Sequence, residues 1–142
     1  MKNPEEIDKL VDKKFLDAEL LIEHAESINN SRYLAGYAIE LALKAKICRH
    51  LDVPDLFSKE QVSKNDVSSP FRSHNLSSLM IYAGLHGKHS EALNDDTDYY
   101  KKWQLVSNWK PSLRYNTQYC DRSKCMEFLK AVNFFIQWIR DN

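Results

Sequence analysis

The stretch RYLAGYAIELALKAKICRH, residues 32–50, decides the fold that this sequence predicts. It is strongly apolar and rich in alanine, as expected for a helix that is buried on most of its sides. At 100° per residue, two stripes run along such a helix. The first stripe is apolar and comprises Leu34, Ala38, Leu41 and Ala45. The second stripe is partly polar and comprises Tyr33, Tyr37, Glu40 and Lys44. The stretch therefore predicts the central helix of the protein.

The N-terminal segment predicts another long helix, over residues 4–28. Asn3 can cap this helix, and Pro4 fits its first turn, where a missing N–H group costs nothing. Apolar residues then recur at spacings of three and four, which places them on one face. The cluster Asn29-Asn30-Ser31 follows, and we expect it to cap the central helix.

The rest of the chain predicts three more main helices. Residues 51–74 hold two prolines and many polar residues, so we expect a long, partly irregular connection with a short helix over 58–66. The other helices are expected over 75–87, where Gly84 and Gly87 mark the end, over 95–110, before Pro111, and from residue 122 onward. The expected fold is all-α, an antiparallel helical bundle of five main helices in a single domain that spans residues 1–142.

The composition agrees with a globular helical protein. The chain of 142 residues is 43% hydrophobic and 28% charged, with only 3 Gly and 4 Pro. No stretch approaches the ~18 apolar residues of a membrane span, and the N-terminus lacks the apolar core of a signal peptide, so we expect a cytoplasmic protein with no membrane partner. The net charge is +0, which argues against a protein that coats nucleic acid nonspecifically.

Cysteine and histidine spacings do not favour a metal site. Cys48, Cys120 and Cys125 form an odd set, for which free thiols are expected. The spacing of Cys120 and Cys125 is wider than in usual zinc sites, and His86-Gly87-Lys88-His89 contains a helix-ending glycine. No glycine-rich phosphate loop is present. We therefore expect no metal and no cofactor.

Glu40 and Lys44 form the most informative charged pair. A glutamate four residues before a lysine places the two side chains side by side on a helix, and here apolar residues flank them. One interpretation is a structural ion pair inside the bundle, because buried charges need partners. The alternative is a role in a ligand pocket or at a dimer interface.

Arg114 and Tyr115 lie in the expected link between the last two helices, with Tyr119 shortly after them. A planar guanidinium and two phenol rings could bind a phosphate and stack on a base. Alternatively, Arg114 caps helix-end carbonyls or pairs with Glu40, while the tyrosine rings fill the end of the bundle.

Three segments together resemble the HEPN domain family of prokaryotes. The first is Tyr33-Leu34-Ala35-Gly36-Tyr37-Ala38-Ile39-Glu40-Leu41-Ala42-Leu43-Lys44-Ala45, the second is His74-x-Leu76-x-x-Leu79, and the third is Trp109 with Arg114-Tyr115. The resemblance spans roughly residues 5–140. It implies a bundle of four to five helices that forms a homodimer. It also implies a minimal nucleotidyltransferase partner in a toxin–antitoxin or defence system, and members of the family bind nucleotides or cleave RNA.

The ribonuclease members of that family carry an arginine followed, after four to six residues, by a histidine. Arg114 has no histidine at this distance, and Arg72-Ser73-His74 is too short. We therefore expect binding of a nucleotide or RNA rather than RNA cleavage. The candidate ligand-binding residues are Arg114, Tyr115, Tyr119, Lys44, Glu40 and His74. The competing hypothesis is a non-catalytic helical dimerisation or interaction module with no small ligand.

Overall fold

The protein is entirely helical in the part of the chain that the computed structural model describes, which is residues 3–60, 67–117 and 120–142. These residues contain six α-helices, three short 3-10 helices and no strand. The α-helices are α1 (Pro4–Leu21), α2 (Ile28–Leu51), α4 (Leu76–Tyr82), α5 (His86–Asp95), α6 (Thr97–Val106) and α7 (Arg122–Asp141). The 3-10 helices are η1 (Ala25–Ser27), η2 (Ser69–Phe71) and η3 (Pro111–Tyr115).

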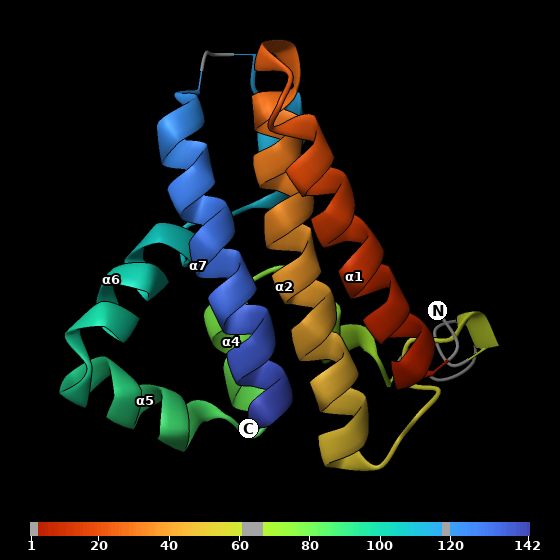
Figure 1. The fold of residues 1–142 in the computed structure, drawn as a ribbon. Coiled ribbons are helices and arrows are strands. Elements are labelled where there is room, and N and C mark those ends of the chain that lie inside the picture. The colour runs from red at the N-terminus through yellow and green to blue at the C-terminus, as the bar shows by residue number, and fades with distance from the viewer. Residues whose placement is uncertain (1–2, 61–66, 118–119) are drawn as a thin grey trace.

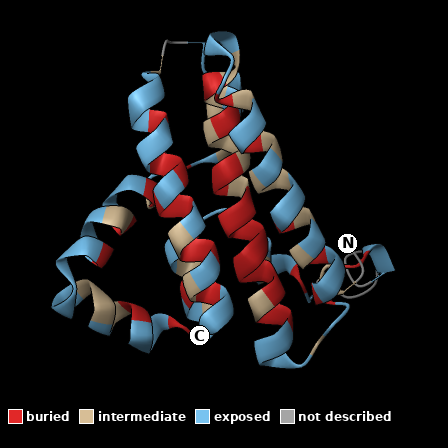
Figure 2. Cartoon of the chain, in the orientation of Figure 1, coloured by how far each residue is buried: buried red, intermediate tan, exposed pale blue. Residues whose placement is uncertain are grey.

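Helix α2 is the centre of the fold. It packs against α1, α7, α4 and η3, and every residue from 38 to 45 is buried. Figure 2 shows this buried band along the middle of the helix. The prediction of a central helix is therefore confirmed. Its alanines have short side chains, which allow the neighbouring helices to approach closely.

The direction of the long helices differs in one respect from the expected bundle. Helix α1 runs antiparallel to the next long helix, α2, as an antiparallel bundle requires, but it also runs antiparallel to α7, and α2 and α7 run in the same direction (Figure 1). Cys125, near the start of α7, lies against the carbonyl of Ile28 at the start of α2. The connection that contains α4, α5 and α6 makes this possible, because it returns the chain to the end from which α2 started.

The boundary between α1 and α2 was predicted wrongly. Asn3 does accept a hydrogen bond from the Glu6 N–H at 2.9 Å, as a helix cap should. However, α1 ends at Leu21 and α2 already begins at Ile28, so the Asn29-Asn30-Ser31 cluster lies inside a helix. The Asn29 amide donates to the carbonyl of Asn116 at 2.8 Å, and the Ser31 hydroxyl donates to that of Ala18 at 2.7 Å. Because distant partners satisfy these side chains, they do not cap the helix.

The single helix predicted over 75–87 is two helices, α4 and α5. Gly84 ends α4 with a φ of 74°, a left-handed conformation that favours glycine, whereas Gly87 lies inside α5. The short helix predicted over 58–66 lies mostly outside the described residues. Within those residues, no helix is long and apolar enough to cross a bilayer.

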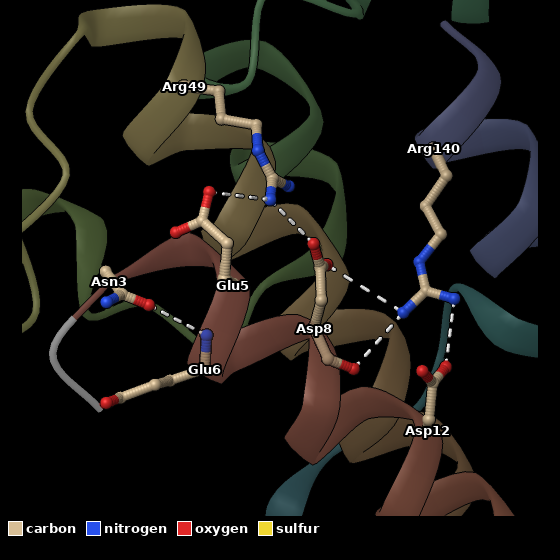
Figure 3. Close-up of polar contacts among 7 residues, drawn as sticks. All are labelled: Asn3, Glu5, Glu6, Asp8, Asp12, Arg49 and Arg140. Atoms are coloured by element: carbon tan, nitrogen blue, oxygen red, sulfur yellow. Dashed lines mark hydrogen bonds and ion pairs between the residues drawn. The ribbon is translucent and has the colours of Figure 1, made fainter.

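Ion pairs join the ends of the three long helices. Asp8 of α1 pairs with Arg49 of α2 at 2.7 Å and with Arg140 of α7 at 3.8 Å. Asp12 of α1 also pairs with Arg140, at 2.9 Å (Figure 3). At the other end of α1, Glu23 pairs with Arg122 at 3.0 Å. Helix α7 is thus tied to both ends of α1.

A buried histidine holds α5 against α6 and α7. His89 is 5% exposed, and its Nδ1 shares a hydrogen bond of 2.5 Å with the hydroxyl of Tyr99. Its ring centroid lies 4.4 Å from that of Trp103 and 6.4 Å from that of Trp138. Burial, with a smaller contribution from His86, lowers the pKa of His89 from 6.5 to about 4. His89 is therefore neutral in the folded protein at pH 7.

We expect His89 to make the protein sensitive to acid. Between pH 6.5 and about 4 the histidine of the unfolded chain binds a proton that the folded chain does not bind, so the unfolding free energy falls as the pH falls. The loss attributable to His89 is at most about 3 kcal/mol. Urea unfolding should show that the unfolding free energy changes less between pH 7 and pH 4.5 for His89→Gln than for wild type. The exposed control His24→Gln should retain the wild-type difference, and equal differences in all three proteins would contradict the role of His89.

Candidate functional site

Three segments that are far apart in the sequence meet on one side of α2. They are the polar stripe of α2 itself, the residues around His74 before α4, and the segment from Trp109 to Tyr115 that includes η3. Helix α2 packs against both α4 and η3. These segments are the ones on which the family resemblance rests, so the tertiary structure brings the resembling residues together.

At the centre of this region lies a buried carboxylate. Glu40 is 0% exposed, and its Oε1 lies 2.7 Å from the Nζ of Lys44. The predicted ion pair between the two residues therefore forms. The Oε2 of Glu40 lies 2.9 Å from the Nδ1 of His74, a second partner that local sequence spacing could not indicate. Both carboxylate oxygens thus have a partner, as a buried charge requires.

His74 connects this buried pair to the surface. Its side chain is 59% exposed although its Nδ1 lies against a buried oxygen. An ionised carboxylate only accepts hydrogen bonds, so Nδ1 is the donor in this contact. The contact with Glu40 therefore sets the orientation of the imidazole ring, which lies in the lining of a groove described below.

Stacked aromatic rings continue the site toward η3. The Tyr33 and Tyr37 rings are 6.1 Å apart with an interplanar angle of 4°, and Trp109 lies 6.2 Å from Tyr33 at 25°. Burial raises the pKa of Tyr37, and the charge of Glu40 adds to the effect. The phenol of Tyr37 is therefore neutral at pH 7 and extends the site as an uncharged surface.

Arg114 lies at the surface end of the aromatic rings. Its guanidinium carbon is 5.8 Å from the ring centre of Tyr33 and 4.8 Å from that of Tyr115, and Nη1 lies 3.5 Å from the Tyr33 hydroxyl. The hydrogen bond to Tyr33 is the main cause of a raised Arg114 pKa. The hypothesis that Arg114 pairs with Glu40 is wrong, because Arg114 lies at the surface against Tyr33 and Tyr115, whereas Glu40 is buried with Lys44 and His74 as its partners.

Two tyrosines, Tyr115 and Tyr119, were predicted to lie beside Arg114, and the structure describes only the first. Tyr115 is 72% exposed, with its ring under the guanidinium of Arg114. It therefore does not fill the end of the bundle, as one of the alternatives proposed. Tyr119 lies outside the described residues. The structure thus supports an exposed cationic and aromatic surface at Arg114 and Tyr115.

A groove of about 460 Å³ separates the start of α4 from η3. It is lined by His74, Asn75, Leu76, Ser107, Trp109, Lys110, Pro111 and Ser112. Among these residues, none carries a carboxylate, and His74 and Lys110 are the ionisable ones. The sequence reasoning missed Lys110 and Ser112. The only available signal was their position between Trp109 and Arg114, because neither belongs to a recognisable motif.

The lining of this groove combines two ionisable side chains, His74 and Lys110, with apolar ones such as Leu76, Trp109 and Pro111. In the described part of the chain, no three His, Cys, Asp or Glu side chains are placed to hold a metal ion. Comparisons of the chain with protein-family models, with curated proteins and with solved structures found no match. The function must therefore be inferred from the site itself.

The stacking of Trp109 on α2 predicts a specific effect at Gly36. A Cβ atom on Gly36 would overlap ring atoms of the buried Trp109, whereas a Cβ atom on Gly87 would meet nothing within 4 Å. We expect Gly36→Ala to destabilise the protein by about 1–3 kcal/mol, although alanine favours a helix. Gly87→Ala should leave stability unchanged or raise it by up to about 1 kcal/mol. Urea unfolding measures both, and a Gly36→Ala variant as stable as wild type would contradict the packing of Trp109 at this position.

Proposed function

We propose that this protein is a HEPN-like domain that binds a nucleotide or the end of an RNA strand in the groove between α4 and η3. The observation that carries the proposal is that two of the resembling segments, around His74 and from Trp109 onward, line this groove, while the third lies on α2, against which α4 and η3 both pack. Each segment contributes a group that suits such a ligand: a histidine fixed by a buried carboxylate, a cationic segment at η3, and stacked aromatic rings on α2.

The charges of the groove favour a phosphate. Lys110 lines the groove, and Arg114 lies farther along η3, outside the lining. Both are exposed and cationic, and a guanidinium matches the geometry of phosphate oxygens. The nearby carboxylate of Glu40 does not oppose an anion, because it is buried and paired with Lys44. A phosphate at the groove therefore meets donors without a competing exposed carboxylate from the described lining.

Exposed aromatic surface favours a base. The Tyr115 ring is 72% exposed, and Arg114 stacks on one of its faces. Stacking of a base on an aromatic ring contributes about 1–3 kcal/mol and depends little on the identity of the base. A nucleotide or an RNA end supplies both the phosphate and the base, whereas inorganic phosphate supplies only the first.

The proposal is limited to binding. The sequence from Arg114 to Cys120 contains no histidine, so the arginine–histidine spacing of ribonuclease members is missing. His74 approaches the site from another segment and is held by Glu40 rather than by a motif shared with Arg114. A minimal nucleotidyltransferase partner in a toxin–antitoxin or defence pair remains part of the proposal through the resemblance alone.

Titrations with AMP and with a labelled single-stranded oligoribonucleotide test the proposed binding. We expect saturable binding at moderate salt, weakened about five- to tenfold by Arg114→Ala or Lys110→Ala, because each removes a charge-assisted donor. Both side chains are exposed, so the melting temperature should not change. Lys101→Ala, on the exposed face of α6, is the matched control and should bind like wild type. No saturable binding of either ligand would favour an interaction module without a small ligand.

We also propose that the protein forms a homodimer. Several large apolar side chains are exposed, including Leu16 (55%), Leu20 (61%), Ile81 (53%) and Met126 (40%). The chain contains 7 Tyr, 6 Phe and 3 Trp, which is more aromatic surface than we expect one small core to bury. Light scattering at micromolar concentration should give the mass of a dimer. A monomer mass of 16.6 kDa at that concentration would contradict the proposal.

A further inference from the structure

A second polar pocket lies where the start of α1 meets the later turns of α2 and α7. Its volume is about 270 Å³, and it is lined by Asp8, Ala42, Lys46, Arg49, Ile139 and Arg140. It shares no lining residue with the groove between α4 and η3. Three of its lining side chains are cationic and one is a carboxylate, so the lining carries an excess of positive charge.

The two arginines of this pocket converge on the same carboxylate. Arg49 Nη2 lies 2.7 Å from Asp8 Oδ2, and Arg140 Nη2 lies 3.8 Å from Asp8 Oδ1. Arg140 Nη2 also donates to the backbone carbonyl of Asp8 at 3.2 Å. Figure 3 shows the guanidinium groups directed toward Asp8 from α2 and α7. These contacts hold both cations in place before any ligand arrives.

The remaining carboxylates lie on the solvent side of the arginines. Glu5 is 3.8 Å from Arg49, and Asp12 is 2.9 Å from Arg140, but their side chains are 71% and 68% exposed. Charges that are so exposed are well screened by water and ions. Neither of them lines the pocket, so they do not neutralise its interior.

Donors remain in the pocket after these ion pairs have formed. The ion pairs of Arg49 use Nη2, and those of Arg140 use Nη1 and Nη2. In the described part of the chain, the Nε groups of both arginines and the ammonium of Lys46 have no ion-pair partner. Lys46 is half-buried and lines the same pocket as two other cations, an arrangement that an anion would stabilise.

We propose that this pocket binds a phosphate group, either as inorganic phosphate or as the phosphate of a monoester. Arginine side chains bind phosphate with paired, directional hydrogen bonds, and a lysine adds a compact positive charge. The apolar side chains of Ala42 and Ile139 limit the access of water to one side of the ligand. The site is independent of the proposed nucleotide-binding groove, and neither depends on the other.

Lys46→Gln tests the pocket without breaking the ion pairs among the helices. Isothermal titration with inorganic phosphate at constant ionic strength should give saturable binding to wild type and about tenfold weaker binding to Lys46→Gln. With phosphate at about ten times its dissociation constant, the wild-type melting temperature should rise by about 4 °C over that in chloride. In phosphate, Lys46→Gln should lose most of this rise in melting temperature. In the absence of phosphate, it should melt at the same temperature as wild type. Lys9→Gln, at an exposed position of α1 outside the pocket lining, should behave like wild type throughout.

Titration with AMP identifies the source of the phosphate. If Lys46→Gln weakens AMP binding at a site whose affinity Lys110→Ala leaves unchanged, the pocket binds the phosphate of a monoester, whether or not AMP also binds the groove. If Lys46→Gln weakens the binding of inorganic phosphate but leaves the binding of AMP unchanged, the pocket selects the free anion. The proposal would be overturned if wild type had the same melting temperature in phosphate and in chloride, or if wild type and Lys46→Gln bound phosphate with equal affinity. Failure of AMP to bind the groove would affect the proposed function alone.

Discussion

The burial of the Glu40 carboxylate is the constraint on which the rest of the structure depends. A lone carboxylate inside a protein is strongly unfavourable, so its position requires partners at hydrogen-bonding distance. Lys44 comes from the next turn of the same helix, but His74 comes from a distant segment and must be brought to α2. His74 lies just before α4, so its contact with Glu40 and the buried Leu76, Leu79 and Met80 of α4 together hold this segment beside α2, where it forms one wall of the groove.

The parallel arrangement of α2 and α7 has a related consequence. Two helices that run in the same direction need a long connection between them, and here that connection contains α4, α5, α6 and η3. The connection contributes His74, Trp109 and Arg114 to the site, while the helices it joins form the rigid support. The polar residues of the groove are therefore held by packed elements at both ends. His89 and its aromatic neighbours secure the middle of the same connection against α7.

The charged side chains fall into two groups with different structural roles. Around Glu40 the charges are compensated in the interior, and His74 and Lys110 are the ionisable side chains that line the groove beside them. Around Asp8 the charges join three helix ends and leave an excess of cationic donors in a pocket. Both regions combine a fixed ion pair with a nearby cation that has a free donor. Cations that are fixed in advance in this way lower the ordering cost of the anion binding that we propose for both regions.

By itself, the sequence determined the helical class, the central position of residues 32–50, the Asn3 cap and the pairing of Glu40 with Lys44. These features depend on local propensity and on spacings of three and four residues, which a sequence contains directly. Tertiary structure alone decided the early start of α2, where Asn29 and Ser31 bond to distant carbonyls, and the partnership of His74 with Glu40. It also decided that Arg114 faces solvent and that Lys46, Arg49 and Arg140 share a pocket. The physical reason is that each of these outcomes depends on groups from separate helices, whose meeting is set by the packing of the whole chain rather than by local spacing.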